Sequence, residues 1–157
     1  ETVYLETTIP SFLAAKASSQ PIIARRQTIT HAWWHNEKAR YKLYSSIFVR
    51  NEALRGDPEA AARRLTFLRD IPELVTPAAT QPLANGLIKL LQLPLKAVVD
   101  ASHLALAILH KIDYLLTWNC THLANPTLQR RLIEYCEHYH LHVPVICTPE
   151  YLTPNLL

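Results

Sequence analysis

The sequence predicts an α/β sandwich with a mainly parallel sheet, and three observations support that class. Short apolar segments at residues 3–5, 114–117 and 143–147 alternate along the chain with longer helical patterns. These segments lack the polar alternation of a half-exposed strand, which is typical of strands covered on both faces. The chain has 157 residues without a repeat, which fits one domain spanning residues 1–157. We expect three α/β/α layers, four to five strands and right-handed crossovers.

The N-terminal third is expected to supply two strands and two helices. Residues 3–5 form the first strand, and a short helix starts at residues 9–11, where proline is tolerated in a first turn. Residues 21–41 contain no glycine, and their apolar residues recur every three to four positions, which predicts a long amphipathic helix. Residues 44–49 are predicted to form the second strand, which leads into a helical turn that carries Glu52.

The middle of the chain contains two helix-start signals. Residues 57–59 (Asp-Pro-Glu) combine an N-cap acceptor, a proline at the first helical position and an acid in the first turn. Residues 76–77 (Thr-Pro) repeat the first two of these features. Residues 72–75 are predicted to form a third short strand. The Asn-Gly pair at 85–86 is compatible with a hairpin, but the leucines around it favour a helix.

The C-terminal part continues the alternation. A helix is predicted over residues 96–110, followed by a fourth strand at 114–117 and a helix over 126–140. The last strand, at 143–147, is expected at a sheet edge because its proline lacks an N–H for the ladder.

Four polar side chains stand where apolar segments stop: Glu6, Glu52, Asp100 and Asn119. Parallel sheets bind ligands beyond the carboxyl ends of their strands, where Glu6 and Asn119 fall. Carboxylate oxygens suit a hard cation such as Mg²⁺ or Mn²⁺, and two or three of them plus substrate phosphates complete its shell. Such a site supports phosphodiester chemistry. In the alternative interpretation, Glu52 is a surface acid and Asp100 pairs with Lys96; the residue types alone leave both open.

Several segments together resemble a known family. They are residues 3–8 (VYLETT), Glu52, residues 100–105 (DASHLA) and residues 116–119 (LTWN). In order and spacing they resemble the acidic motifs of PIN-domain nucleases, in particular the VapC-like toxins of bacterial type II toxin–antitoxin systems. The resemblance covers nearly the whole chain. It implies a PIN-like fold, Mg²⁺- or Mn²⁺-dependent endoribonuclease activity on RNA, a homodimer and inhibition by a cognate antitoxin.

The resemblance also implies which residues act in the site. Glu6, Glu52 and Asp100 are the expected metal ligands and, with Asn119, the expected catalytic residues. Glu6 stands where the family usually has Asp, and its carboxylate is one methylene farther from the backbone. Asn119 stands where the family commonly has Asp. An amide oxygen still ligates a metal but brings no charge, so we expect weaker metal binding and a doubtful second metal.

Three further residues are expected near the substrate. Thr7 or Thr8 occupies the position that helps to hold the site in the family. Arg55 lies one helical turn from Glu52 and could contact a phosphate. His103 lies one turn from Asp100 and could contact substrate or water, although a histidine that merely pairs with an acid is the commoner case.

Two other functions stay open. Asn119 motivates a catalytically weak or silent PIN-like module that binds RNA or an antitoxin. A receiver-like signalling domain also gathers acids at strand ends, but it needs a pair of acids near the first strand and an Asp after the third. Only Glu6 and Thr76 stand at those places. With two glycines in the chain there is no glycine-rich phosphate loop.

Cysteines, histidines and basic residues give weaker signals. Three cysteines are an odd number that fits free thiols and a cytoplasmic protein. The pairs Cys120/His122 and Cys136/His138 are spaced too closely for a usual zinc site, so ordinary packing is preferred. A group of basic residues interleaved with tryptophans is compatible with RNA binding or with a solvated helix face. Its members are Arg25, Arg26, Arg40, Lys42, Arg50 and Arg55. No apolar run is long enough to span a membrane.

Overall fold

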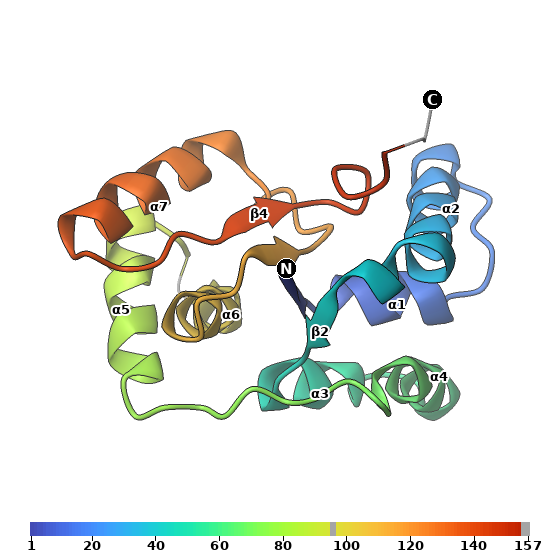
Figure 1. Cartoon of the computed structure of the whole chain (residues 1–157). Helices are drawn as coiled ribbons and strands as arrows, with labels where there is room; N and C mark the ends of the chain where they lie inside the picture. The colour runs from blue at the N-terminus through green and yellow to red at the C-terminus, as the bar shows by residue number, and fades with distance from the viewer. Residues whose placement is uncertain (95–96, 155–157) are drawn as a thin grey trace.

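The computed structural model describes residues 1–94 and 97–154, and within them a four-stranded, all-parallel sheet carries helices on both faces (Figure 1). The strands are β1 (Thr2–Leu5), β2 (Lys42–Tyr44), β3 (Tyr114–Leu116) and β4 (Val145–Cys147). Their order is β2-β1-β3-β4, so β1 and β3 are central and β4 is at the predicted edge. The predicted α/β class with a parallel sheet is confirmed.

The helices form two layers around this sheet. They are α1 (Thr8–Ala14), α2 (Pro21–Asn36), η1 (Lys38–Arg40), α3 (Ile47–Ala53), α4 (Pro58–Leu68), α5 (Thr80–Leu91), α6 (Val98–Leu109) and α7 (Pro126–His138). Side chains of β1 alternate between the layers. Val3 and Leu5 pack in a core with α1 and α2, whereas Tyr4 packs in a core with α3, α5, α6 and α7. In Figure 1, α1 and α2 lie on the opposite side of the strands from α5 and α6.

The predicted strand over residues 44–49 is wrong beyond Tyr44. Ser46 adopts an extended conformation, and its side chain accepts a hydrogen bond from the Val49 N–H at 3.3 Å, which caps α3. The β-branched and aromatic residues that follow Ser46 are therefore helical, because a cap satisfies the first free N–H groups of the helix. Glu52 consequently lies within α3, and its position depends on that cap.

The predicted third strand at 72–75 is also wrong. Only an isolated parallel bridge joins Ser45 to Glu73, since Pro72 has no N–H and Val75 is exposed. Helix α5 begins at Thr80 rather than at the predicted 76–77 start, because the Thr80 N–H bonds to the Pro77 carbonyl in a preceding turn.

Other predicted boundaries agree with the structure within a few residues. The Asp57 side chain caps α4 by accepting from the Ala60 N–H at 2.8 Å, as expected. The segment around residues 85–86 is helical rather than a hairpin. The helix predicted over 21–41 ends at Asn36, and that predicted over 96–110 starts at Val98; Lys96 lies outside the described residues.

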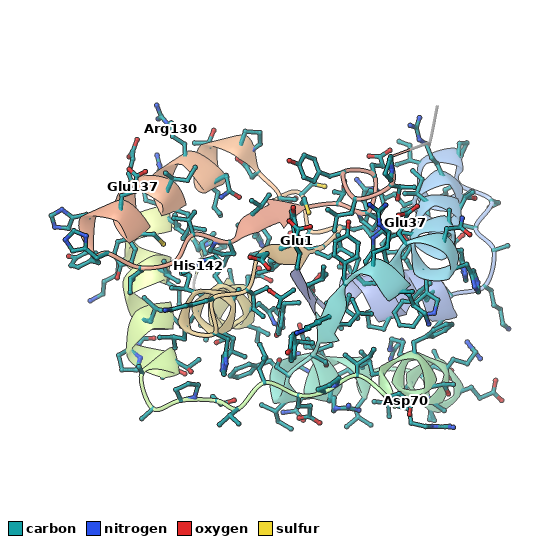
Figure 2. The ribbon with its side chains drawn as sticks, in the orientation of Figure 1. Glu1, Glu37, Asp70, Arg130, Glu137 and His142 are labelled. Atoms are coloured by element: carbon teal, nitrogen blue, oxygen red, sulfur yellow. The ribbon has the colours of Figure 1, made fainter. Side chains whose placement is uncertain are left out.

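Charged side chains gather at the periphery of the molecule. Arg130 and Glu137 project from α7, and Asp70 lies just after α4 (Figure 2). No helix in the described part of the chain is long and apolar enough to cross a membrane. The few polar groups buried near the sheet therefore stand out against an ordinary charged surface.

Candidate metal centre

Glu6 comes directly after the central strand β1 and is almost completely buried, with 4% of its surface exposed. Its backbone N–H continues the ladder to the Leu116 carbonyl at 3.0 Å. Its Oε2 accepts three hydrogen bonds: from the Thr8 N–H (3.0 Å), the Thr8 hydroxyl (2.5 Å) and the Thr117 hydroxyl (2.7 Å). No described residue donates to Oε1. One oxygen is thus fixed by three hydrogen bonds, and the other accepts none from the described residues.

Glu52 approaches the same place from α3. Its Oε2 accepts from the Thr7 hydroxyl at 2.5 Å and lies 3.0 Å from Nε2 of His103. Burial opposes ionisation, but the hydrogen bonds from His103 and Thr7 and the charge of Arg55 outweigh it and lower the pKa of the Glu52 carboxyl. Because a carboxylate only accepts, His103 donates through Nε2.

His103 on α6 is completely buried and belongs to a chain of hydrogen bonds. Its Nδ1 lies 2.7 Å from the Tyr4 hydroxyl, which lies 2.6 Å from the hydroxyl of Ser46. Burial raises the pKa of Tyr4, so its hydroxyl keeps its proton. With Nε2 donating to Glu52, Tyr4 donates to Nδ1 and Ser46 donates to Tyr4, which satisfies every member of the chain.

We call Glu6, Glu52 and His103 the inner cluster. A carboxylate oxygen from each acid and a ring nitrogen of His103 all lie within 4.8 Å of one another, as donors to one cation require. Among the described residues, no group of three metal-ligating side chains that includes Asp100 has this spacing. The structure thus brings two of the three predicted acidic ligands together and adds a nitrogen.

Asp100, Asn119 and His122 form a second group, the outer cluster. Asp100 Oδ1 accepts from the Asn119 amide at 3.1 Å, and its Oδ2 lies 3.1 Å from Nδ1 of His122. The Asn119 carbonyl oxygen in turn accepts from the His122 N–H at 3.0 Å. The side chains of Asp100 and His122 are 18% and 27% exposed, so this cluster is more open to solvent than Glu6 and His103.

Thr117 links the two clusters. Its hydroxyl donates to Glu6 and accepts from the Asn119 N–H at 2.9 Å, and the residue is completely buried. Four residues of this network were not predicted as site residues from the sequence: Thr117, Tyr4, Ser46 and, as a partner of Asp100, His122. Only Thr117 could have been predicted, because it stands directly after strand β3, as Glu6 stands directly after β1.

The residues predicted to contact the substrate lie in different environments. Thr7 and Thr8 both hold the site, since Thr7 donates to Glu52 and Thr8 to Glu6. Arg55 is exposed and close enough for its charge to act on Glu52. His103 is buried between Tyr4 and Glu52, and a contact between His103 and substrate stays a prediction.

The weaker sequence signals are resolved by packing. Cys136 is buried, all three cysteines are free, and within the described ranges neither Cys120 nor Cys136 joins a metal-ligating group of three. Several members of the basic group are engaged inside the protein. Arg50 donates to the carbonyls of Leu68 and Ile71, and Arg26 lies 5.2 Å from the ring centre of Trp118. The interleaved tryptophans are buried, so they do not form a stacking surface.

Comparison of the sequence with protein-family models and with curated proteins finds no match. Among solved structures, the fold is similar to a chain in the crystal structure of VapBC2 from Rickettsia felis bound to a DNA fragment from their promoter. The TM-score is 0.54 with 13% sequence identity, and the match covers 94% of this chain and 98% of that chain. At this identity the likeness establishes a shared fold over nearly the full length of both chains.

Proposed function

We propose that the protein is a metal-dependent endoribonuclease and the toxin of a toxin–antitoxin pair. The inner cluster is the observation that carries this proposal, because two carboxylates and a nitrogen converge within 4.8 Å beyond the end of a central parallel strand. The fold likeness to a VapBC2 chain supports the second part. With it we propose an RNA substrate, a cognate antitoxin, a homodimer and a cytoplasmic location.

The two clusters take different roles in this proposal. Glu6 and Glu52 hold Mg²⁺ or Mn²⁺ directly, and Thr8 and Thr7 fix the carboxylates in place. A bound cation supplies Lewis-acid stabilisation of the charge that develops on a phosphodiester. Asp100 supplies a third carboxylate from the outer cluster, where Asn119 and His122 orient it. Arg55 contributes a positive charge at the rim for the RNA backbone.

The direct test is cleavage of RNA by the purified protein with Mn²⁺. Glu6→Gln keeps the shape of the buried side chain but removes its charge, so cleavage is expected to fall to background. Glu59→Gln is the matched control, because Glu59 is 86% exposed at the start of α4 and should leave cleavage unchanged. Equal cleavage by the wild type and Glu6→Gln would contradict the proposal.

One observation favours a second candidate, a catalytically weak or silent module that binds RNA or an antitoxin. Asn119 uses its amide nitrogen to donate to Asp100 and its carbonyl oxygen to accept from His122, so both of its ends are engaged within the protein. Calorimetric titration with Mn²⁺ separates the two candidates. The nuclease is expected to bind the ion, whereas a silent module binds RNA without taking up metal.

A further inference from the structure

We propose that His103 is a direct nitrogen ligand of the cation, so that the centre binds Mn²⁺ and Co²⁺ in preference to Mg²⁺. This inference rests on the proposed function in one respect, namely that a divalent cation occupies the inner cluster. It goes beyond that function because it replaces an all-oxygen site by a mixed oxygen–nitrogen site.

The distances already match a shared ion. Nε2 of His103 and Oε2 of Glu52 are 3.0 Å apart. Two ligands that bind one ion at right angles, each at about 2.1 Å, also lie about 3.0 Å apart. The separation fits a shared cation as well as it fits the hydrogen bond, and a carboxylate oxygen of Glu6 belongs to the same group of donor atoms within 4.8 Å of one another.

The surroundings of His103 fit a metal ligand. A histidine that binds a metal through one ring nitrogen usually donates its other N–H to a fixed partner, which sets the tautomer. Here Nδ1 faces the Tyr4 hydroxyl at 2.7 Å, and that hydroxyl faces Ser46 at 2.6 Å. With a cation on Nε2, Nδ1–H donates to Tyr4 and Tyr4 donates to Ser46. The chain from His103 through Tyr4 to Ser46 therefore fits both tautomers of His103, because its two hydrogen bonds can run in either direction.

Asp100 stands apart from the inner cluster. Its Oδ1 faces the Asn119 amide and its Oδ2 faces His122, both in the outer cluster. Within residues 1–94 and 97–154, Glu6, Glu52 and His103 form the only group of three ligating side chains whose donor atoms all lie within 4.8 Å of one another. The third direct ligand is therefore the buried imidazole.

Ion preference follows from the donor set. Mg²⁺ favours oxygen ligands and keeps several waters, whereas imidazole suits later divalent metals, and affinity at such sites rises from Mn²⁺ to Co²⁺. Losing the nitrogen should therefore weaken Mn²⁺ and Co²⁺ binding much more than Mg²⁺ binding.

The test is pulsed electron paramagnetic resonance of the Mn²⁺-loaded protein, with and without ¹⁵N-histidine labelling. We expect a nitrogen coupling that changes with the label. His103→Gln should abolish it and weaken Mn²⁺ and Co²⁺ binding by at least about 10-fold in calorimetry, with Mg²⁺ affinity changed less than about 3-fold. His122→Gln, in the outer cluster, is the control and should keep the coupling.

The outcomes separate this inference from the proposed function. Mn²⁺ bound without any histidine coupling overturns the nitrogen ligand but leaves the metal-dependent nuclease standing. Absence of Mn²⁺ binding overturns both. Because the labelling experiment uses the wild-type protein, the result does not depend on whether His103→Gln folds. Tyr4→Phe adds a second check, since loss of the Nδ1 partner should weaken Co²⁺ binding by about 10-fold.

Discussion

The inner and outer clusters use similar residue types in different environments. Glu6 and His103 are buried, whereas the side chains of Asp100 and His122 are 18% and 27% exposed; Glu52, at 24%, is the part of the inner cluster that reaches solvent. In the inner cluster threonine hydroxyls hold the carboxylates, and in the outer cluster an amide and an imidazole hold the one carboxylate. The clusters thus differ in the groups that hold their carboxylates and in the burial of Glu6 and His103, and electrostatic interactions are stronger where water is excluded.

The largest expected effect tests how much the hydroxyl that links the two clusters contributes to stability. Thr117→Val replaces the linking hydroxyl by a methyl group of similar size, which leaves both the Glu6 oxygen and the Asn119 N–H without that partner. We expect a loss of about 3 kcal/mol in the free energy of unfolding, measured by urea denaturation. Thr66→Val on the exposed face of α4 is the control and should cost much less. Equal losses would mean that the two hydrogen bonds of Thr117 contribute no more than the single bond of an exposed threonine.

Adding a negative charge to the outer cluster is expected to have an intermediate effect on stability. Asn119→Asp replaces the amide donor to Asp100 by a second carboxylate, so the metal-free protein should lose about 1–2 kcal/mol of stability. Mn²⁺ should recover this loss, giving a larger rise in melting temperature than in the wild type. Asn85→Asp on the exposed side of α5 is the control. If Mn²⁺ raises both melting temperatures equally, the outer cluster lies beyond the influence of the ion.

The smallest effect is a pH dependence carried by the inner cluster. The pKa of Glu52 is lowered in the folded protein, so the stability it contributes is present above its ordinary value of 4.5 and disappears as the pH falls through the lowered pKa. The wild type should therefore lose more stability than Glu52→Gln between pH 5 and pH 3, measured by denaturation at each pH. Asp113, whose pKa is also lowered, is common to both proteins and cancels in the difference. Parallel curves would show that Glu52 is not stabilised in its charged form.

Local pattern was enough to predict the fold and the ends of the central strands. Uninterrupted apolar segments mark buried parallel strands, and this places Glu6 and Asn119 at one edge of the sheet. Asp57 was predictable as a cap for the same reason, because the whole signal lies within three residues.

Contacts across the chain were beyond such patterns. The strand predicted over residues 44–49 missed a local signal instead, because the Ser46 cap reaches the Val49 N–H only three residues on. Tyr4 meets His103 across 99 positions, and no local period reveals that pairing. For the same reason the sequence grouped Asp100 with the inner acids, whereas side-chain packing pairs it with Asn119 and His122.

The central place of β1 has a consequence for how the protein is made. Strand β1 leaves the ribosome more than a hundred residues before its neighbour β3, and Thr117 follows β3 directly. A nascent chain therefore carries Glu6 and Glu52 long before it carries the hydroxyl that fixes Glu6. Since non-local parallel pairing is also slow to form, the centre is completed only after Thr117 has been synthesised and β3 has paired with β1.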